Sequence, residues 1–421
     1  MRIEIPHGKG TQTLTVADER LHAVLTPAHE VHEAADQQSL VRAALASPIG
    51  SAPLHELARG KDKIVVITSD HTRPLPSSIT LPLYLEEIRR GNPDADITIL
   101  IATGVHRSPT EAEMRAKYGQ AIVDHEKLLV HNASDDSQLT FMGILPSGGE
   151  LWLNKLVAEA DLVVSEGFVE PHFFAGFSGG RKSILPGVAG RKTVLYNHNA
   201  HFIHAPQARQ GILADNPIHR DMAFAAQTAK LGFILNVLLD GDKRIISAFA
   251  GDSVKAHEAA CALCLQQTSV PAAAADIVVT SNGGYPLDQN IYQCVKGLTA
   301  AESCVREGGV IILSAGLGDG HGGEAFYRWF ADRASAAEVA QAIESVPPEN
   351  TFMDQWEAQI LARVMLKANC WFVTGEENRA LIETMHMRWA PDADTALAEA
   401  TALLGANATV TVIPDGVGVI V

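Results

Sequence analysis

Short runs of aliphatic and β-branched residues recur along the chain, and segments with helical periodicity separate them. The apolar runs predict buried strands. They are Lys63–Ile67, Ile97–Ile101, Lys127–Val130, Leu162–Val164, Phe233–Val237, Ile277–Val279, Val310–Leu313 and Cys370–Val373. The helical patterns include Leu81–Arg90, Pro109–Tyr118, Ser253–Gln267 and Ser335–Ser345. Because strands and helices alternate, the sequence predicts an α/β fold with mostly parallel sheets.

One loop is the best candidate for a domain boundary. In Thr268–Ala275 a helical pattern ends near a proline, and small residues precede the next strand. We therefore expect an N-terminal α/β domain over residues 1–269 and a C-terminal α/β domain over residues 270–407, with the active site in the cleft between them. Two further strand patterns, Ala408–Ile413 and Gly416–Val421, are candidates for packing back onto the N-terminal domain.

Composition excludes several classes of partner. The chain has 421 residues, 47% of them hydrophobic, and a formal charge of −16. No run of basic residues is longer than Arg191-Lys192, so a nucleic-acid surface is not expected. Charged or helix-breaking residues interrupt every apolar stretch before membrane-spanning length, and the first residues lack the apolar run of a signal peptide. We expect a small-molecule partner, no membrane and a cytoplasmic location.

The five cysteines do not suggest a disulfide framework, because their number is odd and they are widely spread. Cys261 and Cys264 have the two-residue spacing of a redox or metal pair. They lie in an alanine-rich, helix-prone stretch with no second pair nearby. This context favours two buried helical cysteines.

The segment Glu170–Ser183 combines a lysine with several glycines. Gly176–Ser183 is similar to a P-loop, but Arg181 stands where that motif requires its second glycine. An arginine there weakens the interpretation as a nucleotide phosphotransferase, since the glycine lets backbone N–H groups curl around phosphate. Lys182 is then either an exposed lysine on a glycine-rich turn or a partly desolvated, nucleophilic one.

Several histidines stand where chemistry is often found. His106 and His172 each follow a strand pattern and lie beside glycine or proline, so they are candidates for an acid/base pair. An ordinary surface or core role is the alternative for each. His198, His201 and His204 crowd one stretch, where an imidazole can ligate a late first-row metal. Their spacing matches no zinc signature.

Other polar residues are candidates for binding the carboxylate group of a small ligand. Arg73 offers a bidentate fork and Lys296 a point charge, while Tyr292 and Gln293 add neutral donors. The alternative for the last three is the polar face of a helix start. The glycine-rich loop Gly316–Gly323 fits no nucleotide fingerprint, and we interpret it as a wall of the site.

Several motifs occur in order across nearly the whole chain. They are Asp70–Pro74, Thr103–Arg107, Pro171–Lys182, Asn197-His198, Tyr292–Lys296 and Asp319–Gly323. Together they resemble the nickel-dependent lactate racemase family, whose members are 2-hydroxyacid racemases and epimerases that use a nickel-pincer nucleotide.

The resemblance implies a cofactor and the residues that hold it. Lys182 corresponds to the lysine joined through a thioamide to pyridinium-3,5-bisthiocarboxylic acid mononucleotide, and His198 to the protein ligand of its nickel. Further positions are implied near the cofactor, namely Asp70, Gly179, Gly180, Tyr292 and Gln293. Dedicated cofactor-synthesis enzymes are implied as partners, and without them the protein would be made in its apo form.

The resemblance also implies the reaction. His106 and His172 would be the acid/base pair, and Arg73 and Lys296 would hold the substrate carboxylate. The substrate would be lactate or another aliphatic, aryl, dicarboxylic or sugar-derived 2-hydroxy acid, inverted at C2 through transient hydride transfer to the cofactor. Two alternatives remain, namely a P-loop-like phosphotransferase and a protein that binds the cofactor or a carboxylate without turnover.

Overall fold

The computed structural model of this protein describes residues 1–27 and 36–421, and the chain divides into two compact units. Unit 1 comprises Met1–His29, His198–His204 and Gln267–Val421, and unit 2 comprises Glu30–Asn197 and Ala205–Gln266. This grouping differs from the expected ranges 1–269 and 270–407. The amino-terminal segment and the short segment that begins at His198 belong with the C-terminal part of the chain.

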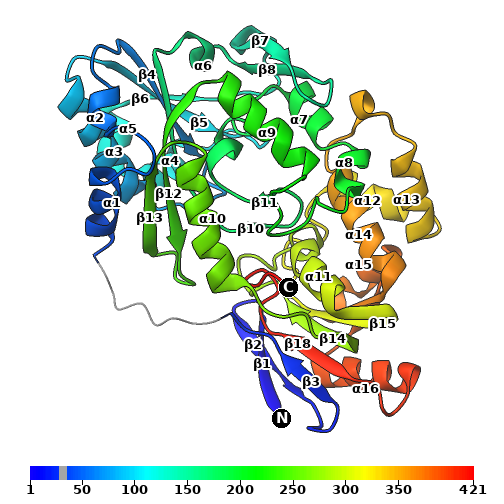
Figure 1. The fold of residues 1–421 in the computed structure, drawn as a ribbon. Helices are drawn as coiled ribbons and strands as arrows, with labels where there is room; N and C mark the ends of the chain where they lie inside the picture. The colour runs from blue at the N-terminus through cyan, green and yellow to red at the C-terminus, as the bar shows by residue number, and fades with distance from the viewer. Residues whose placement is uncertain (28–35) are drawn as a thin grey trace. The chain divides into compact units, whose positions relative to one another are not determined.

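Unit 2 is built on a six-stranded sheet (Figure 1). Its strands, in spatial order, are β13 (Ile245–Gly251), β12 (Leu231–Leu239), β9 (Leu162–Phe168), β4 (Lys63–Ser69), β5 (Asp96–Ala102) and β6 (Lys127–Val130). Every neighbouring pair is parallel except β12 and β13. Consecutive residues of β4 and β5 are buried, which explains why these strands read as continuous apolar runs without alternation.

Helices α1 (Gln37–Ala46), α2 (Leu54–Leu57) and α3 (Ser77–Gly91) gather on one side of this sheet (Figure 1). Val41 of α1, Leu54 of α2 and Tyr84 of α3 belong to the same core cluster as Ile64 and Val66 of β4. The other regular elements of the unit carry or support loops. They are α4 (Glu111–Tyr118), α5 (Gln120–His125), η1 (Asp136–Gln138), β7 (Leu139–Ile144), β8 (Glu150–Asn154), α6 (Lys155–Glu159), β10 (Pro171–His172), β11 (Gly176–Phe177), η2 (Gly180–Ser183), α7 (Arg191–Asn197), α9 (Pro217–Thr228) and α10 (Lys255–Thr268).

Unit 1 contains a second six-stranded sheet, in which every neighbouring pair is parallel. Its order is β17 (Arg388–Ala390), β16 (Asn369–Val373), β15 (Val305–Ser314), β14 (Ala275–Ser281), β18 (Val410–Ile413) and β3 (Leu21–Val24). A hairpin precedes it, and helices connect its strands. These elements are β1 (Arg2–His7), β2 (Gly10–Thr15), α8 (Ala200–His204), α11 (Ile291–Cys304), α12 (Glu324–Ala331), α13 (Ala336–Glu344), η3 (Pro348–Asn350), α14 (Gln355–Lys367), η4 (Glu376–Asn378), α15 (Arg379–Thr384) and α16 (Ala393–Leu404).

The strand and helix patterns are confirmed with one exception. The predicted strands from Lys63 to Val373 lie within β4, β5, β6, β9, β12, β14, β15 and β16, and the quoted helices lie within or around α3, α4, α10 and α13. The prediction of a strand over Gly416–Val421 is wrong. The Asp415 carboxylate accepts hydrogen bonds from the backbone N–H groups of Val417 and Gly418, at 3.0 and 3.2 Å, and so closes a turn. Only Ile420 forms a bridge, to Ser269.

Two expectations drawn from composition can be compared with the structure. Cys261 and Cys264 lie buried on α10, as their alanine-rich context predicted. Within residues 1–27 and 36–421, no helix combines the length and the apolar character needed to cross a lipid bilayer.

Helix α4 begins with a capping box that should contribute measurably to stability. The Glu113 N–H donates to Thr110 Oγ1 at 3.3 Å, and the Thr110 N–H donates to Glu113 Oε2 at 2.7 Å. Thr110→Ala should lower the free energy of unfolding by about 1 kcal/mol, because it leaves a helix-terminal N–H without its side-chain acceptor. Thr110→Ser keeps that acceptor and should retain most of the stability. Urea unfolding of both variants checks this, and equal losses would contradict it.

Candidate functional site

The polar residues predicted for the N-terminal part of the site follow neighbouring strands of the unit 2 sheet. Asp70 and Arg73 come directly after β4, His106 after β5 and His172 after β9. These strands are adjacent and parallel, in the order β9-β4-β5. Their carboxyl ends therefore lie at the same edge of the sheet, which is where open α/β sheets place ligands.

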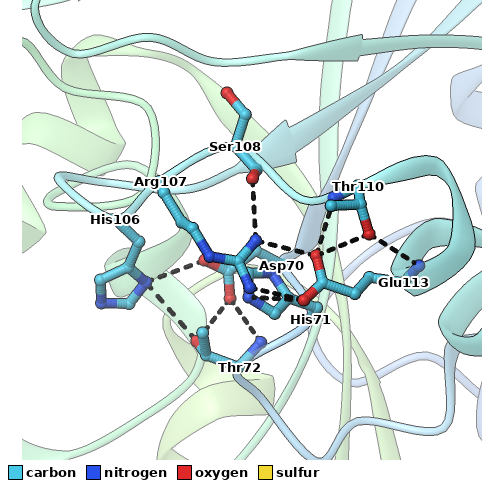
Figure 2. Close-up of polar contacts among 8 residues, drawn as sticks. All are labelled: Asp70, His71, Thr72, His106, Arg107, Ser108, Thr110 and Glu113. Atoms are coloured by element: carbon cyan, nitrogen blue, oxygen red, sulfur yellow. Dashed lines mark hydrogen bonds and ion pairs between the residues drawn. The ribbon is translucent and has the colours of Figure 1, made fainter.

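Asp70 and His106 form a direct pair (Figure 2). His106 Nδ1 lies 2.8 Å from Asp70 Oδ2, and the Asp70 side chain is 1% exposed whereas that of His106 is 40% exposed. The backbone N–H and hydroxyl of Thr72 donate to Asp70 Oδ1 at 3.0 and 2.6 Å. Because a carboxylate only accepts, a neutral His106 carries its proton on Nδ1 and keeps a lone pair on Nε2. That arrangement suits a general base.

The charge of Asp70 supports the same role. Burial by itself raises the pKa of the Asp70 carboxyl, but the hydrogen bond and charge of His106, the Thr72 hydroxyl and the charge of Arg73 outweigh it. Together they bring that pKa from 3.8 down to about 2. Asp70 is therefore ionised at neutral pH, and it stabilises the imidazolium that forms when His106 accepts a proton.

A charged contact from α4 supports the loop that carries His106 (Figure 2). Arg107 donates to both carboxylate oxygens of Glu113, with Nη1 at 2.8 Å from Oε2 and Nη2 at 2.5 Å from Oε1. His71 Nε2 lies 3.6 Å from Glu113 Oε1. Glu113 thus contacts residues of the loop after β4 and of the loop after β5, which are the two loops that meet in the Asp70–His106 pair.

The second histidine lies in an aromatic setting that it shares with the predicted attachment lysine. The His172 ring stacks on Phe173 and meets Phe174 edge-on, with centroids 5.0 and 4.5 Å apart. The backbone N–H of Ala175 donates to His172 Nδ1 at 3.3 Å. Lys182 Nζ lies 5.7 Å from the centroid of the Phe174 ring. The structure therefore brings His172 and Lys182 to the same phenylalanine.

Arg181, the residue that breaks the P-loop pattern, points into the protein. Its guanidinium donates to the carbonyl oxygens of Ala175 at 2.7 Å and Phe177 at 2.8 Å, and to His219 Nδ1 at 2.9 Å. Burial lowers the pKa of Arg181 to about 10, and burial followed by the Arg181 charge lowers that of His219 to about 4. His219 is thus a neutral acceptor at pH 7. The loop is curled around an arginine of its own chain, where a P-loop curls around phosphate.

Gly179 and Gly180 are required by the backbone of this loop. Both have left-handed φ values, +76° and +51°. A Cβ on Gly179 would lie 2.8 Å from Asn236 Oδ1, and one on Gly180 would lie 2.7 Å from the His257 ring. The Gly180 N–H also donates to Asn236 Oδ1 at 2.9 Å. Packing within unit 2 therefore accounts for both glycines, while their predicted contact with a cofactor stays a prediction.

The residues predicted for the C-terminal part of the site occupy the first turns of α11. Lys296 Nζ donates to Gln293 Oε1 at 2.9 Å, and the Tyr292 hydroxyl donates to Asp354 Oδ1 at 3.1 Å. The glycine-rich loop borders this helix start, since the Tyr292 N–H donates to the carbonyl of His321 at 3.3 Å. Tyr292, Gln293 and Lys296 are thus brought together in unit 1.

His198 belongs to the same unit and is 5% exposed. Its ring meets Trp356 edge-on at a centroid distance of 5.0 Å. His201 and His204 are exposed, so the structure separates them from the buried His198. Within the described part of the chain, no group of three or more His, Cys, Asp or Glu side chains is placed to hold a metal ion.

The sequence reasoning missed two neighbours of these residues on α14. Trp356 packs edge-on against the His198 ring, and Glu357 is 1% exposed. Burial raises the pKa of the Glu357 carboxyl, against the charge of Lys296 and with that of Asp354. A buried glutamate has no periodic signal of its own in the sequence, because glutamate is ordinarily placed on the exposed face of a helix.

Comparisons with known proteins lead to the same family that the sequence motifs indicate. The family model for the lactate racemase N-terminal domain matches residues 7–211, and that for the C-terminal domain matches residues 270–421. The chain belongs to the lactate racemase family. Lactate racemases of Thermoanaerobacterium thermosaccharolyticum and Lactiplantibacillus plantarum are each 51% identical to it over 420 residues, covering 100% of this chain and 99% of the relative. The predicted family membership is confirmed.

Solved structures of related proteins support the fold. The lactate racemase apoprotein of Thermoanaerobacterium thermosaccharolyticum matches with a TM-score of 0.97 at 50% identity, covering 100% of this chain and 99% of that one. A protein from Thermotoga maritima matches with a TM-score of 0.64 at 17% identity, covering 88% of this chain and 98% of that one. The second likeness shows the fold alone.

Arg181 should be irreplaceable by lysine. An ammonium cannot reach the carbonyls of Ala175 and Phe177 together with His219, so Arg181→Lys leaves buried acceptors without donors. We expect the free energy of unfolding to fall by roughly 2–4 kcal/mol. The exposed Arg42, which pairs with Glu86, provides the matched control, and Arg42→Lys should leave stability nearly unchanged. Equal thermal midpoints for the two variants would contradict this role of Arg181.

Proposed function

We propose that this chain is a racemase that interconverts the enantiomers of lactate. The observation that carries the proposal is the placement of the Asp70–His106 pair, His172 and Lys182 in loops that follow neighbouring parallel strands of one sheet. The full-length identity of 51% to two lactate racemases supports lactate as the substrate. Other short 2-hydroxy acids are the alternatives within the same reaction class.

The protein's own residues would move the hydroxyl proton. His106 Nε2 accepts the proton from the C2 hydroxyl of one enantiomer, and Asp70 stabilises the resulting imidazolium. We assign His172 to the other enantiomer; its ring is held by Phe173 and by the Ala175 N–H, which donates to Nδ1, so the proton exchanged with the substrate hydroxyl is the one on Nε2. Each histidine returns its proton in the reverse direction, which suits a reaction that must run both ways.

The substrate carboxylate needs fixed cations. We assign it to the Arg73 guanidinium, which is exposed and can bind a carboxylate with two parallel hydrogen bonds. Lys296, beside Gln293 and Tyr292 in unit 1, stays a predicted second cation for a carboxylate. Holding the carboxylate fixes the orientation of C2 before reaction, so less orientational freedom is lost in the transition state.

The residues present fit a covalently held nickel-pincer nucleotide. Lys182 presents an amine beside an aromatic ring and His172, and His198 is a single buried imidazole. A nickel ion on His198 would take its other ligands from the cofactor, because the described side chains offer no cluster of metal ligands. When bound, this group supplies an acceptor for the hydride that leaves C2. Lys182 would hold it through a thioamide, and cofactor-synthesis enzymes would have to provide it.

Measurement of the intact protein mass tests whether the cofactor is attached to Lys182. Protein made together with the cofactor-synthesis enzymes should contain nickel and a covalent adduct and should racemise lactate in a chiral assay. Lys182→Ala should lose both adduct and activity, whereas the exposed Lys127→Ala should keep both. A nickel-free, unmodified protein with full activity would overturn the cofactor assignment. Binding of lactate without turnover would favour a carrier protein.

The Asp70–His106 pair predicts that removing the charge of Asp70 lowers kcat. Asp70→Asn keeps the shape of the side chain but removes the charge that stabilises the His106 imidazolium. We expect kcat to fall by about 10²–10⁴-fold while the covalent adduct still forms. Intact mass and racemisation rates of the same preparation check this. A kcat close to that of the unaltered protein would move the base elsewhere.

A further inference from the structure

The end of helix α4 holds the loop that carries Asp70 and Arg73. Lys117 Nζ donates to the carbonyl oxygens of Arg73 at 2.7 Å and Leu75 at 2.9 Å. The next residue, Tyr118, donates its hydroxyl to the carbonyl of Ser69 at 2.9 Å. Both ends of this loop are therefore tied to two consecutive residues of one helix.

The same helix supports the loop that carries His106. Near its first turn, Glu113 pairs with Arg107 and lies close to His71 (Figure 2). Helix α4 therefore contacts the loop after β4 through its last turn and the loop after β5 through its first. It is the shared support of the groups proposed to bind and deprotonate the substrate.

Lys117 is half-buried, and its ammonium is directed at backbone carbonyl oxygens. Burial lowers the pKa of Lys117 from 10.5 to about 8, while the charges of Glu166 and Asp70 oppose that change and the charge of Arg73 adds to it. A lysine that only packed its methylenes would place the ammonium in water. Here the half-buried ammonium donates to two backbone carbonyl oxygens.

Glu166 supplies the opposite charge. It lies on β9, is 2% exposed, and accepts hydrogen bonds from the hydroxyls of Thr68 at 2.6 Å and Thr80 at 2.5 Å. The charge of Lys117 lowers the pKa of Glu166 against the larger effect of burial, which raises it. Neither Lys117 nor Glu166 has a part in the proton transfers proposed above, so their burial needs another explanation.

The backbone of Arg73 is held by a hydrogen bond, whereas its side chain is not. The backbone carbonyl is held by Lys117, whereas the side chain is exposed and forms no hydrogen bond or ion pair with the residues that the structure describes. An arginine anchored at its main chain and open at its guanidinium is prepared to receive an anion with little further ordering of the backbone. The nearby Lys117 ammonium adds positive potential at the same place.

We propose that Lys117 is a positioning residue of the carboxylate site: its ammonium fixes the backbone of Arg73 so that the guanidinium meets the carboxylate of a 2-hydroxy acid. The inference rests on the proposed function. It assigns Lys117 to substrate binding and not to chemistry, because Lys117 contacts the Arg73 main chain, whereas the proton-accepting pair is Asp70 and His106. Removing the ammonium should therefore weaken binding more than it slows conversion.

The test compares Lys117→Met, Lys117→Arg and, as a matched control, Lys127→Met at an exposed lysine that pairs with Asp96. Each protein is made with the cofactor-synthesis enzymes, and its adduct is measured by intact mass before kinetics with lactate. For Lys117→Met we expect KM to rise about 10- to 100-fold, with kcat within about threefold and normal adduct formation. Lys117→Arg, which can still donate to both carbonyls, should recover much of the loss. Lys127→Met should match the unaltered protein.

The outcomes distinguish a failure of the positioning role of Lys117 from a failure of the proposed racemase function. An unchanged KM in Lys117→Met, or a fall in kcat or adduct formation without a rise in KM, overturns the positioning role. If the methionine variant does not fold, Lys117→Gln, which removes the charge and has a shorter side chain that cannot reach both carbonyls, is judged by the same criterion. Unaltered protein that carries the adduct but racemises no 2-hydroxy acid would instead refute the proposed function.

Discussion

Parallel pairing of β5, β4 and β9 is the constraint on which the candidate site of unit 2 depends. Parallel strands bring their carboxyl ends to one edge, so loops far apart in the sequence meet there. Asp70 and His106 form a hydrogen bond across two of these loops. The same sheet order brings the loop after β9, with His172 and Lys182, to that edge. Without this register, the individual motifs would have no common location.

Two cations, the buried Arg181 and the half-buried Lys117, then fix the loops at this edge. Both direct their charge at backbone carbonyl oxygens, and neither forms an ion pair with a carboxylate among the described residues. Carbonyl acceptors let one side chain hold several points of a loop at once, whereas a carboxylate partner would hold only another side chain. The cost of burying the Arg181 charge is offset by these hydrogen bonds. The same two side chains therefore fix the shape of the loops and place positive charge beside them.

Much of the fold could be predicted because buried parallel strands have a strong apolar signal. The runs in β4, β5, β14 and β15 needed no tertiary information. The strand predicted over Gly416–Val421 failed because Asp415 closes a local turn that competes with extended pairing. The grouping of the first residues and of His198 with unit 1 was also beyond reach, since it depends on long-range contacts that no local pattern encodes.

By itself, the sequence determined the α/β class, the family and the residue types offered for chemistry, because these depend on local periodicity and on ordered motifs. Only the tertiary structure decided which partners those residues have. It pairs Asp70 with His106, directs Arg181 into the protein, packs Trp356 against His198, and places the Lys117 ammonium on the Arg73 backbone. The physical reason is that hydrogen bonding and burial depend on distances between segments remote in sequence, and folding alone sets those distances.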